Sequence, residues 1–394
     1  MSLVTKSSVA AIVGIGQTEY SRASGKSEWE LANEAIAKAL QDCGLEAADV
    51  DGLVHSTYDS VDEAMVLRSF PATLSFYSQV PYGGLGVPGM VAHALAAVGS
   101  GQARVVVAYR SLNGYSNTRY GRAERSLGSE LEIVATGDRA PSGAFAAPYG
   151  VLSPGHIMAL WARRYQANHA VSDDDLTQAF SRIALQQRAY ANRNPHAVMH
   201  DKTLVANEYF GARMITEPLR LYDFALETDG AAAIVVTSRD VAKSLVNRPA
   251  YIAGATQGLI RYAETLATYG ELRNGPQYVA IANKLYDRAG VKPKDISAAM
   301  LYDATTMTVL LAFEAYGFAP IGKGTDVIRE HGIGLQSPLP VNTAGGHLSE
   351  AYVHFMNSII ESVRQFRGTS TNQVHDVKAV LCCSGPSAFI LRAD

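Results

Sequence analysis

The sequence of 394 residues is 47% hydrophobic and 18% charged, so it can bury a large core, and we expect two lobes of similar size. Its formal net charge of -3 gives no overall electrostatic reason to expect nucleic acid or an anionic membrane as a partner. Three cysteines are too few and too unevenly spaced for a disulfide framework or a four-ligand zinc site, and no apolar run approaches the roughly 18 residues of a membrane span. With no signal-peptide pattern at the N-terminus, these features predict an unprocessed cytoplasmic protein without a bound metal.

The predicted elements alternate between buried strands and amphipathic helices. In chain order they are a strand at 9–16, a helix at 28–43, a strand at 52–55, a turn at Gly83-Gly84, a helix through 93–97 and a strand at 105–107. Gly44 follows the first helix and is a typical C-terminal stop. The order strand, helix, strand, helix, strand predicts a wound α/β unit with right-handed crossovers.

The same order of elements recurs about 240 residues later. The second copy comprises a strand at 250–255, a helix at 277–289, a strand at 298–301, a turn at Gly345-Gly346, a helix through 352–360 and a strand at 380–382. Gly290 stops the second helix as Gly44 stops the first, and the short phrases after both stops match residue for residue. The repeat predicts two duplicated α/β halves, residues 1–245 and 246–394.

A long segment, about residues 110–220, separates the two copies and is rich in Arg, Tyr, Pro and His. A duplicated scaffold can hold such an inserted loop domain without depending on its sequence, so insertions often carry substrate-selecting loops. His156 begins a helix there, and it would either face a substrate or form part of a capping turn.

The pair Gly14 and Gly16 does not complete a dinucleotide-binding fingerprint. Glu19 stands where the third glycine would be, and no acidic residue is well placed to bind a ribose. We therefore expect no dinucleotide cofactor.

Two phrases make a resemblance to a known family specific. Residues 229–236 read Asp-Gly-Ala-Ala-Ala-Ile-Val-Val, similar to the strand that closes the first half of thiolases, and residues 342–349 resemble the N-x-x-GG-x-x-S segment of the sterol-carrier-protein type of thiolase. With the repeat and the insertion, the chain resembles thiolases along nearly its whole length. The resemblance implies the thiolase fold, with five layers (α-β-α-β-α) and an inserted loop domain, and a homodimer.

Three positions depart from the thiolase pattern. Gly84 stands where thiolases have their nucleophilic cysteine, and Tyr302 and Tyr352 stand where thiolases have two histidines. An acyl-enzyme cannot form on a glycine. This pattern resembles the lipid-transfer-protein-like aldolases of bacterial steroid side-chain degradation, which are related to thiolases.

That resemblance implies a carbon–carbon lyase. The reaction would be the retro-aldol cleavage of a β-hydroxyacyl-CoA, such as a steroid side-chain thioester, to a ketone or aldehyde and a short acyl-CoA such as propionyl-CoA or acetyl-CoA. Coenzyme A would be part of the substrate, with no further cofactor. The resemblance also implies a small DUF35-type OB-fold protein as a partner, in a heterotetramer.

Retro-aldol chemistry needs a base for the hydroxyl proton, donors for the enolate oxygen and an acid for the α carbon. We expect Tyr302 and Tyr352 to be the acid and base, with their individual roles open. Because the ordinary pKa of tyrosine is about 10, a tyrosinate base needs a lowered pKa or concerted proton removal.

The remaining candidate residues would support these tyrosines. Asp303 would orient its neighbours, and Gly84 would leave room where the cysteine stood. Backbone N–H groups near Gly345 and Gly346, or the His347 side chain, would donate to the enolate oxygen.

Alternative readings remain open at this stage. Cys382 or Cys383 could serve an acyltransferase or thiolase reaction, although a buried strand is the simpler account of both, and Cys43 is expected in the core. The chain could also be a non-catalytic carrier of lipid or acyl-CoA, or a scaffold subunit. The insertion's arginines and tyrosines could contact CoA phosphates or a partner, or could form a solvated loop; they are Arg110, Arg119, Arg122, Arg125, Tyr115 and Tyr120.

Overall fold

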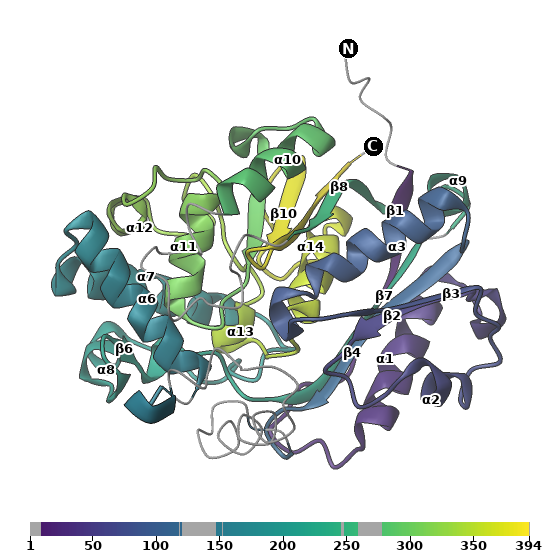
Figure 1. Ribbon diagram of the computed structural model, residues 1–394, viewed down its shortest axis with the longest axis horizontal. Coiled ribbons are helices and arrows are strands. Elements are labelled where there is room, and N and C mark those ends of the chain that lie inside the picture. Colours follow the sequence, from purple (N-terminus) through teal and green to yellow (C-terminus); the bar gives the residue numbers. More distant parts are fainter. Residues whose placement is uncertain are drawn as a thin grey trace.

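The computed structural model describes residues 9–117, 119, 147–151, 153–245, 248–258 and 278–393. Among these residues, the central element is a nine-stranded mixed sheet with the strand order β3-β2-β4-β7-β1-β8-β11-β10-β9 (Figure 1). Its strands are β1 (Ala10–Gln17), β2 (Gly52–Ser56), β3 (Phe76–Val80), β4 (Val105–Asn113), β7 (Asp229–Ser238), β8 (Ala250–Gln257), β9 (Ala298–Leu301), β10 (Ala379–Cys383) and β11 (Ser387–Arg392).

The two ends of this sheet repeat one plan. In the first half, β2 runs parallel to β4, which pairs antiparallel with β7, which pairs antiparallel with β1. In the second half, β9, β10, β11 and β8 have the same order and directions. The halves join through β1 and β8, where Ala11 pairs with Tyr251 and Ile12 with Ala250. The duplication predicted from the sequence is therefore present in the strand order, while the boundary at residue 245 stays a prediction.

Helices cover the sheet in the layers expected of a thiolase fold. The helix α1 packs on the outer face of the first half-sheet, α10 and α11 pack on the second, and α3 and α14 contact both half-sheets from between them (Figure 1). The bounds of these helices are α1 (Glu28–Cys43), α3 (Pro88–Ser100), α10 (Val279–Ala289), α11 (Thr306–Ala315) and α14 (Met356–Arg367).

Local sequence accounts for the bounds and packing of α1. The Ser27 side chain accepts from the Glu30 N–H and the Glu30 carboxylate accepts from the Ser27 N–H, and Gly44 ends the helix in the left-handed conformation at φ 73°. A Cβ at Gly14 or Gly16 would overlap the backbone of α1, so these two glycines allow the close approach of β1 and α1. Their role in the described structure is packing.

A third group of elements flanks the second half-sheet and contains much of the predicted insertion. In Figure 1, α6, α7 and α8 lie to one side of the sheet, next to α11 and α12. The elements of this group are α6 (Pro154–His169), α7 (Asp173–Ala191), α8 (Ala206–Gly211), β5 (Met214–Thr216), β6 (Leu219–Arg220), α12 (Gly324–His331) and α13 (Gly346–Ser349). The described residues of the first half also form the short helices α2 (Glu63–Leu67) and α9 (Arg239–Ala242). The extent of the insertion as a separate unit stays a prediction.

Within the described residues, no helix is both long and apolar enough to cross a membrane.

Candidate active site

Tyr302 is the first residue after β9, and the backbone fixes its position. Its N–H donates to the Cys383 carbonyl at 2.9 Å. One residue earlier, the Asn342 side chain pairs with both backbone groups of Leu301, accepting from the N–H at 2.8 Å and donating to the carbonyl at 2.9 Å. These two hydrogen bonds hold the segment that contains Gly345 and Gly346 against the end of β9.

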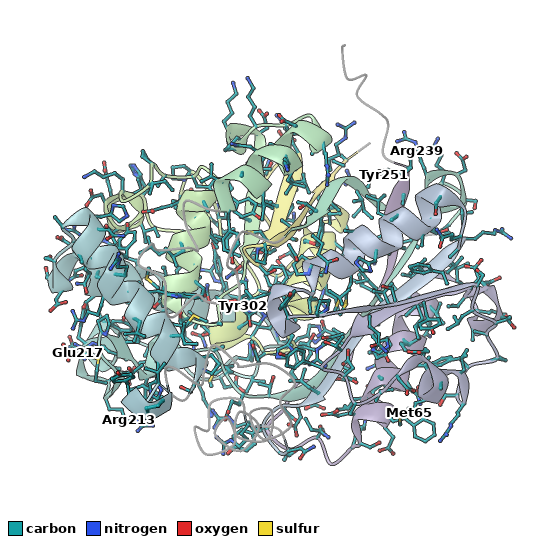
Figure 2. All side chains as sticks on the ribbon, viewed as in Figure 1. Met65, Arg213, Glu217, Arg239, Tyr251 and Tyr302 are labelled. Carbon is teal, nitrogen blue, oxygen red and sulfur yellow. The ribbon has the colours of Figure 1, made fainter. Side chains whose placement is uncertain are left out.

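Tyr352 lies in the loop between α13 and α14, and its hydroxyl meets that of Tyr302. The two Oη atoms are 2.7 Å apart, and either can be the donor. Thr228 holds the Tyr352 backbone, since its hydroxyl accepts from the Tyr352 N–H at 2.9 Å. Tyr302 is only 6% exposed and lies near the centre of the molecule in Figure 2, between the sheet and the helices α6 to α8. The structure thus brings together the two tyrosines that the sequence predicted as an acid/base pair.

Gly84 lies against the Tyr302 side chain. A Cβ atom at position 84 would stand 2.5 Å from Tyr302 Oη and 2.6 Å from Cζ. Because such contacts lie well inside van der Waals distance, any side chain at position 84 would displace Tyr302. The absence of a side chain at Gly84 and the position of Tyr302 therefore depend on each other, while their correspondence to a thiolase cysteine and histidine stays a prediction.

Asp303 and His347 form a buried pair behind Tyr302. Both side chains are fully buried, and His347 Nδ1 bonds to Asp303 Oδ1. His347 Nε2 accepts from the Phe355 N–H at 2.9 Å, so the ring carries its proton on Nδ1, toward Asp303. The His347 ring packs edge-on against Tyr302 and Tyr352, with centroids 5.2 Å from each.

The contacts of the predicted supporting residues indicate which roles these residues can take. Asp303 bonds to His347 and to the Leu348 N–H, which favours the predicted orienting role, and that role stays a prediction. The donor role of His347 stays a prediction, but both of its ring nitrogens already bond within the protein, which favours a positioning role. Gly345 and Gly346 adopt positive φ, 109° and 58°, and their close approaches are to Ala191 and to the Asp303 carboxylate.

A second buried system reaches the tyrosines from the first half of the chain. Arg110 in β4 is fully buried and ion-paired with the buried Asp59, which follows β2. The Arg110 Nε and Nη2 groups donate to His354 Nδ1 at 3.1 and 2.7 Å. The His354 ring in turn packs edge-on against Tyr352, with centroids 5.0 Å apart.

Burial shifts the acid–base properties of this system. It raises the pKa of the Asp59 carboxyl, although Arg110 and the backbone N–H groups of Ser111 and Ser56 oppose the increase. Burial, together with the charge of Arg110 and the nearby His347, holds the pKa of His354 well below its usual range. His354 is therefore a neutral imidazole near neutral pH.

The loop that carries Tyr352 has an unusual backbone. His354 and Phe355 have φ of 45° and 81°, in the left-handed region that non-glycine residues rarely adopt. The Phe355 N–H bonds to His347 and the His354 ring to Arg110, so these contacts hold the strained turn. Backbone strain of this kind is common at functional sites, where many surrounding contacts hold the strained conformation.

A narrow, mainly apolar cavity of about 30 Å³ opens beside Tyr302. Its walls come from the Gly83-Gly84 turn, α6, α11 and the loop after β10. The lining residues other than Tyr302 are Leu85, Met158, Trp161, Tyr278, Thr308, Leu311, Ala312, Ser384 and Gly385. Hydrophobic and aromatic walls are typical of sites for apolar ligands, but such sites have volumes of roughly 300–1,000 Å³, so this cavity by itself does not hold a steroid.

The cysteines are unsuited to nucleophilic catalysis. Cys382 and Cys383 are fully buried in β10, and Cys43 is fully buried at the C-terminal end of α1. Burial raises the pKa of Cys382 to about 12 and that of Cys383 well above its usual range. Because the thiolate is the nucleophile, this argues against the acyltransferase alternative.

The structure describes some of the candidate residues of the predicted insertion. Arg110 was expected in a loop that meets CoA phosphates, a partner or solvent; this is wrong, because β4 extends through Arg110 and the side chain is fully buried. Arg119 pairs with Glu227, and the His156 Nδ1 atom accepts from the Ser153 N–H at 3.3 Å, as a capping turn requires. The predictions for Tyr120, Arg122 and Arg125 lie outside the described residues.

Sequence reasoning missed Asp59 and His354. One signal was available: Tyr58-Asp59 follows the second strand of the first half, much as Tyr302-Asp303 follows its counterpart in the second half. Another was the histidine two residues after Tyr352. No signal linked Arg110 to either residue. Among the described residues, no cluster of three or more His, Cys, Asp or Glu side chains could hold a metal ion.

Comparisons with known proteins identify similar chains. The thiolase C-terminal domain-like family matches residues 276–388. A steroid side-chain-cleaving aldolase of Thermomonospora curvata is 40% identical over 392 residues, covering 98% of each chain. A 17-hydroxy-3-oxo-4-pregnene-20-carboxyl-CoA lyase of Mycobacterium tuberculosis is 40% identical over 379 residues, 95% of this chain and 96% of that protein. A solved Ltp2-ChsH2(DUF35) aldolase matches with a TM-score of 0.88 and 38% identity, covering 99% of both chains.

Two relatives at 40% identity over nearly the whole chain are close enough to establish a family, and the solved structure establishes the fold. The resemblance drawn from Gly84, Tyr302 and Tyr352 is confirmed for the thiolase fold and for the carbon–carbon lyase class. The chain belongs to the thiolase-superfamily aldolases that cleave steroid side chains.

Proposed function

We propose that this protein cleaves a 17-hydroxysteroid CoA thioester by a retro-aldol reaction in which Tyr302 and Tyr352 move the protons. The substrate class is suggested by the name of the relative from Mycobacterium tuberculosis, a 17-hydroxy-3-oxo-4-pregnene-20-carboxyl-CoA lyase. The observation that carries the assignment of roles is the 2.7 Å contact between the two tyrosine hydroxyls, with the Tyr302 phenol in the space that a side chain at position 84 would fill.

The reaction balances without a cofactor. A base removes the proton of the 17-hydroxyl group, the C17–C20 bond breaks, and C17 becomes a ketone. The electron pair of the broken bond moves into the thioester as an enolate, and C20 then takes a proton to give propionyl-CoA. The 17-ketone and propionyl-CoA together contain every atom of the substrate, so neither water nor a redox partner is consumed.

The tyrosine pair suits both proton transfers. One phenol takes the hydroxyl proton as it passes its own proton along the hydrogen bond to the other, and the second phenol gives its proton to C20, so both tyrosines end protonated as they began. Tyr302 is buried and Tyr352 is partly buried, so the access of water to the enolate is restricted. Behind the pair, Asp303 and His347 fix the ring of Tyr302, and Thr228 fixes the backbone of Tyr352.

The first test compares Tyr302→Phe and Tyr352→Phe with the unsubstituted protein, in an assay that follows both the steroid ketone and propionyl-CoA. Each variant keeps its ring and loses its hydroxyl, and we expect kcat to fall by at least about 10²-fold, the scale of general acid–base catalysis. The matched control is Tyr286→Phe, because Tyr286 is as buried as Tyr302 but donates to the Tyr316 carbonyl. Full turnover by both active-site variants would refute the proposed roles, and binding without cleavage by the unsubstituted protein would point to a carrier.

We further propose that the active assembly contains a DUF35 partner, since the similar solved structure is a complex of Ltp2 with ChsH2(DUF35). The test is copurification with a DUF35 protein encoded beside the gene, and turnover with and without it. An active protein that neither binds nor needs such a partner would refute this part of the proposal.

We propose a homodimer at the centre of that assembly. The strand β3 is one of the two edge strands of the sheet in the described residues, and its first four residues alternate between partly buried and exposed positions, with Tyr77 59% exposed. An edge strand of this kind is a ready site for pairing with a second copy. Light scattering during gel filtration should give the mass of two chains, whereas a single-chain mass would contradict the proposal.

A further inference from the structure

We propose that the indole N–H group of Trp161 binds the thioester carbonyl oxygen of the substrate and stabilises this oxygen as it becomes the enolate. The inference rests on the proposed retro-aldol function and assigns the donor that this reaction needs. Trp161 lies in α6, within the segment of about residues 110–220 that the sequence predicts to be an inserted loop domain. The proposal therefore connects the insertion to the tyrosine pair.

The Trp161 side chain is buried without an acceptor for its N–H group. The residue is 7% exposed, and Nε1 is a buried atom with no hydrogen-bond partner in the described part of the chain. An indole nitrogen can only donate, and buried donors in folded proteins nearly always have an acceptor. Because an unpaired buried donor lowers stability, its presence calls for a reason. A hydrogen bond to a ligand is such a reason.

The second tryptophan of the chain shows the usual arrangement. The sequence contains two tryptophans, Trp29 and Trp161. Trp29 in α1 is partly buried, and its Nε1 donates to the Met65 carbonyl at 3.0 Å. The lack of an acceptor is therefore particular to position 161.

Trp161 forms part of the wall of the cavity beside Tyr302. Of the buried polar side-chain atoms that lack a partner in the described residues, Trp161 Nε1 alone belongs to a residue of this wall. Three other polar side chains of the wall already bond within the protein: Tyr302 with Tyr352, Thr308 with the Thr305 carbonyl, and Ser384 with the Leu85 carbonyl. We therefore place the acceptor for Trp161 in this cavity.

The size of the cavity limits which part of a substrate enters it. A water molecule needs roughly 10–15 Å³ of such volume, so about 30 Å³ accommodates a carbonyl group but not a steroid ring system. Tyr302 contributes to the same wall, and in the proposed reaction the tyrosine pair protonates the carbon next to the thioester carbonyl. The thioester oxygen is therefore the acceptor that this reaction brings to the cavity. This oxygen gains negative charge as the C17–C20 bond breaks.

The predicted donor side chain, His347, is less suited to this task. It directs Nδ1 toward Asp303, and its Nε2 accepts from the Phe355 N–H. An indole N–H remains a donor throughout the pH range in which proteins fold, and it does not give up its proton to the enolate. Removal of one donor to a developing oxyanion typically lowers kcat by about 10²- to 10³-fold.

The kinetic test removes the N–H group and keeps an aromatic ring. Trp161→Phe, and replacement of Trp161 by benzothienylalanine, should each lower kcat by about 10²- to 10³-fold. Benzothienylalanine has the shape of tryptophan with sulfur in place of the N–H group. KM should stay within about threefold, because the negative charge on the oxygen develops only in the transition state. Full turnover by the benzothienylalanine variant would show that the ring packs and does not donate, and the inference would be wrong.

The matched control is Trp29→Phe, which should leave kcat unchanged because Trp29 lies on α1 and bonds to Met65. If Tyr302→Phe and Tyr352→Phe lose turnover but the benzothienylalanine variant does not, the inference fails and the proposed function stands. If the tyrosine variants keep turnover, the proposed function itself fails.

The spectroscopic test uses the unsubstituted protein and does not depend on the folding of Trp161 variants. Protein labelled with ¹⁵N in its indole rings should give two indole signals, which the loss of one signal in Trp29→Phe assigns. Propionyl-CoA should move the Trp161 proton downfield, as a new hydrogen bond does, and leave the Trp29 signal in place. S-propyl-CoA, which lacks only the carbonyl oxygen, should not produce this shift. Equal shifts with the two compounds, or no shift of the Trp161 signal at saturating propionyl-CoA, would overturn the inference.

Discussion

The hydroxyl of Tyr302 lies 2.7 Å from the hydroxyl of Tyr352, and the missing side chain of Gly84 makes room for the first of these phenols. The tyrosines come from two segments of the second half of the chain, and the glycine comes from the first half. The site is therefore assembled across the joint between the duplicated halves. A substitution at any one of Gly84, Tyr302 and Tyr352 should therefore disturb the other two residues.

Gly84→Ala tests the coupling between the glycine and the tyrosine pair. The new Cβ would stand 2.5 Å from Tyr302 Oη, so the phenol must move out of line with Tyr352. A misplacement of about 1 Å can cost about 10²-fold in rate, and we expect a loss of that size. The control is Gly99→Ala in α3, whose Cβ would meet only Val9 at 3.5 Å and should leave kcat unchanged. Equal activity of Gly84→Ala and the unsubstituted protein would show that Tyr302 is not held by this contact.

The buried cysteines make a prediction about chemical modification. With a pKa of about 12, Cys382 is almost wholly protonated at pH 7.5, and burial raises the pKa of Cys383 well above its usual range too. Iodoacetamide should therefore leave the native enzyme active, and the thiols should react quickly only after unfolding in urea. Inactivation that acyl-CoA prevents would instead favour the acyltransferase alternative.

Asp303→Ala should destabilise the fold as well as the site. The substitution leaves the His347 Nδ1–H and the Leu348 N–H groups buried without their acceptor, and each unsatisfied donor costs about 1–3 kcal/mol. We expect the free energy of unfolding in urea to fall by about 3 kcal/mol. Asp326→Ala, which removes an exposed ion pair with Lys323, should change it by less than about 0.5 kcal/mol. A similar small change for Asp303→Ala would contradict the buried pairing.

Glu350 should make stability depend on pH. It is 1% exposed, and burial raises its pKa to about 8. Between pH 4.5 and 8 the unfolded chain releases this proton while the folded chain keeps it, so folding stability falls as pH rises through this range. At pH 8 the penalty exceeds that at pH 5 by about 3 kcal/mol.

The measurement for Glu350 is urea denaturation of Glu350→Gln and the unsubstituted protein at pH 5 and pH 8. The glutamine side chain cannot ionise, so the variant should gain stability relative to the unsubstituted protein as pH rises. An equal difference at both pH values would show that Glu350 does not titrate in this way.

The order of the helices and strands, and many of their bounds, could be predicted from the sequence because the signals for them are local. The helix predicted at 28–43 is observed over Glu28–Cys43, since a capping box and a C-terminal glycine mark its ends. The helix predicted at 277–289 is observed over Val279–Ala289. The repeat then paired each strand with its counterpart, and the replaced thiolase residues identified the tyrosines.

Polar contacts between residues far apart in the sequence could not be predicted in this way. Because a charged residue usually lies at an exposed position, the sequence predicts Arg110 in a loop. Its partners are Asp59, 51 residues away, and His354, 244 residues away. No periodic pattern specifies which buried charges meet across two half-sheets. Only the fold shows that this arginine supports the active site.

The most direct test of the account is cleavage of the 17-hydroxysteroid CoA thioester in D₂O, with mass spectrometry of the released propionyl-CoA. An enolate that the tyrosine pair protonates should yield propionyl-CoA with one deuterium at its α carbon, because tyrosine hydroxyls exchange with solvent. The protein should also exchange an α proton of added propionyl-CoA, and Tyr302→Phe and Tyr352→Phe should lose both activities. Cleavage at full rate without α-deuterium, or undiminished exchange in both variants, would contradict an enolate mechanism that depends on these tyrosines.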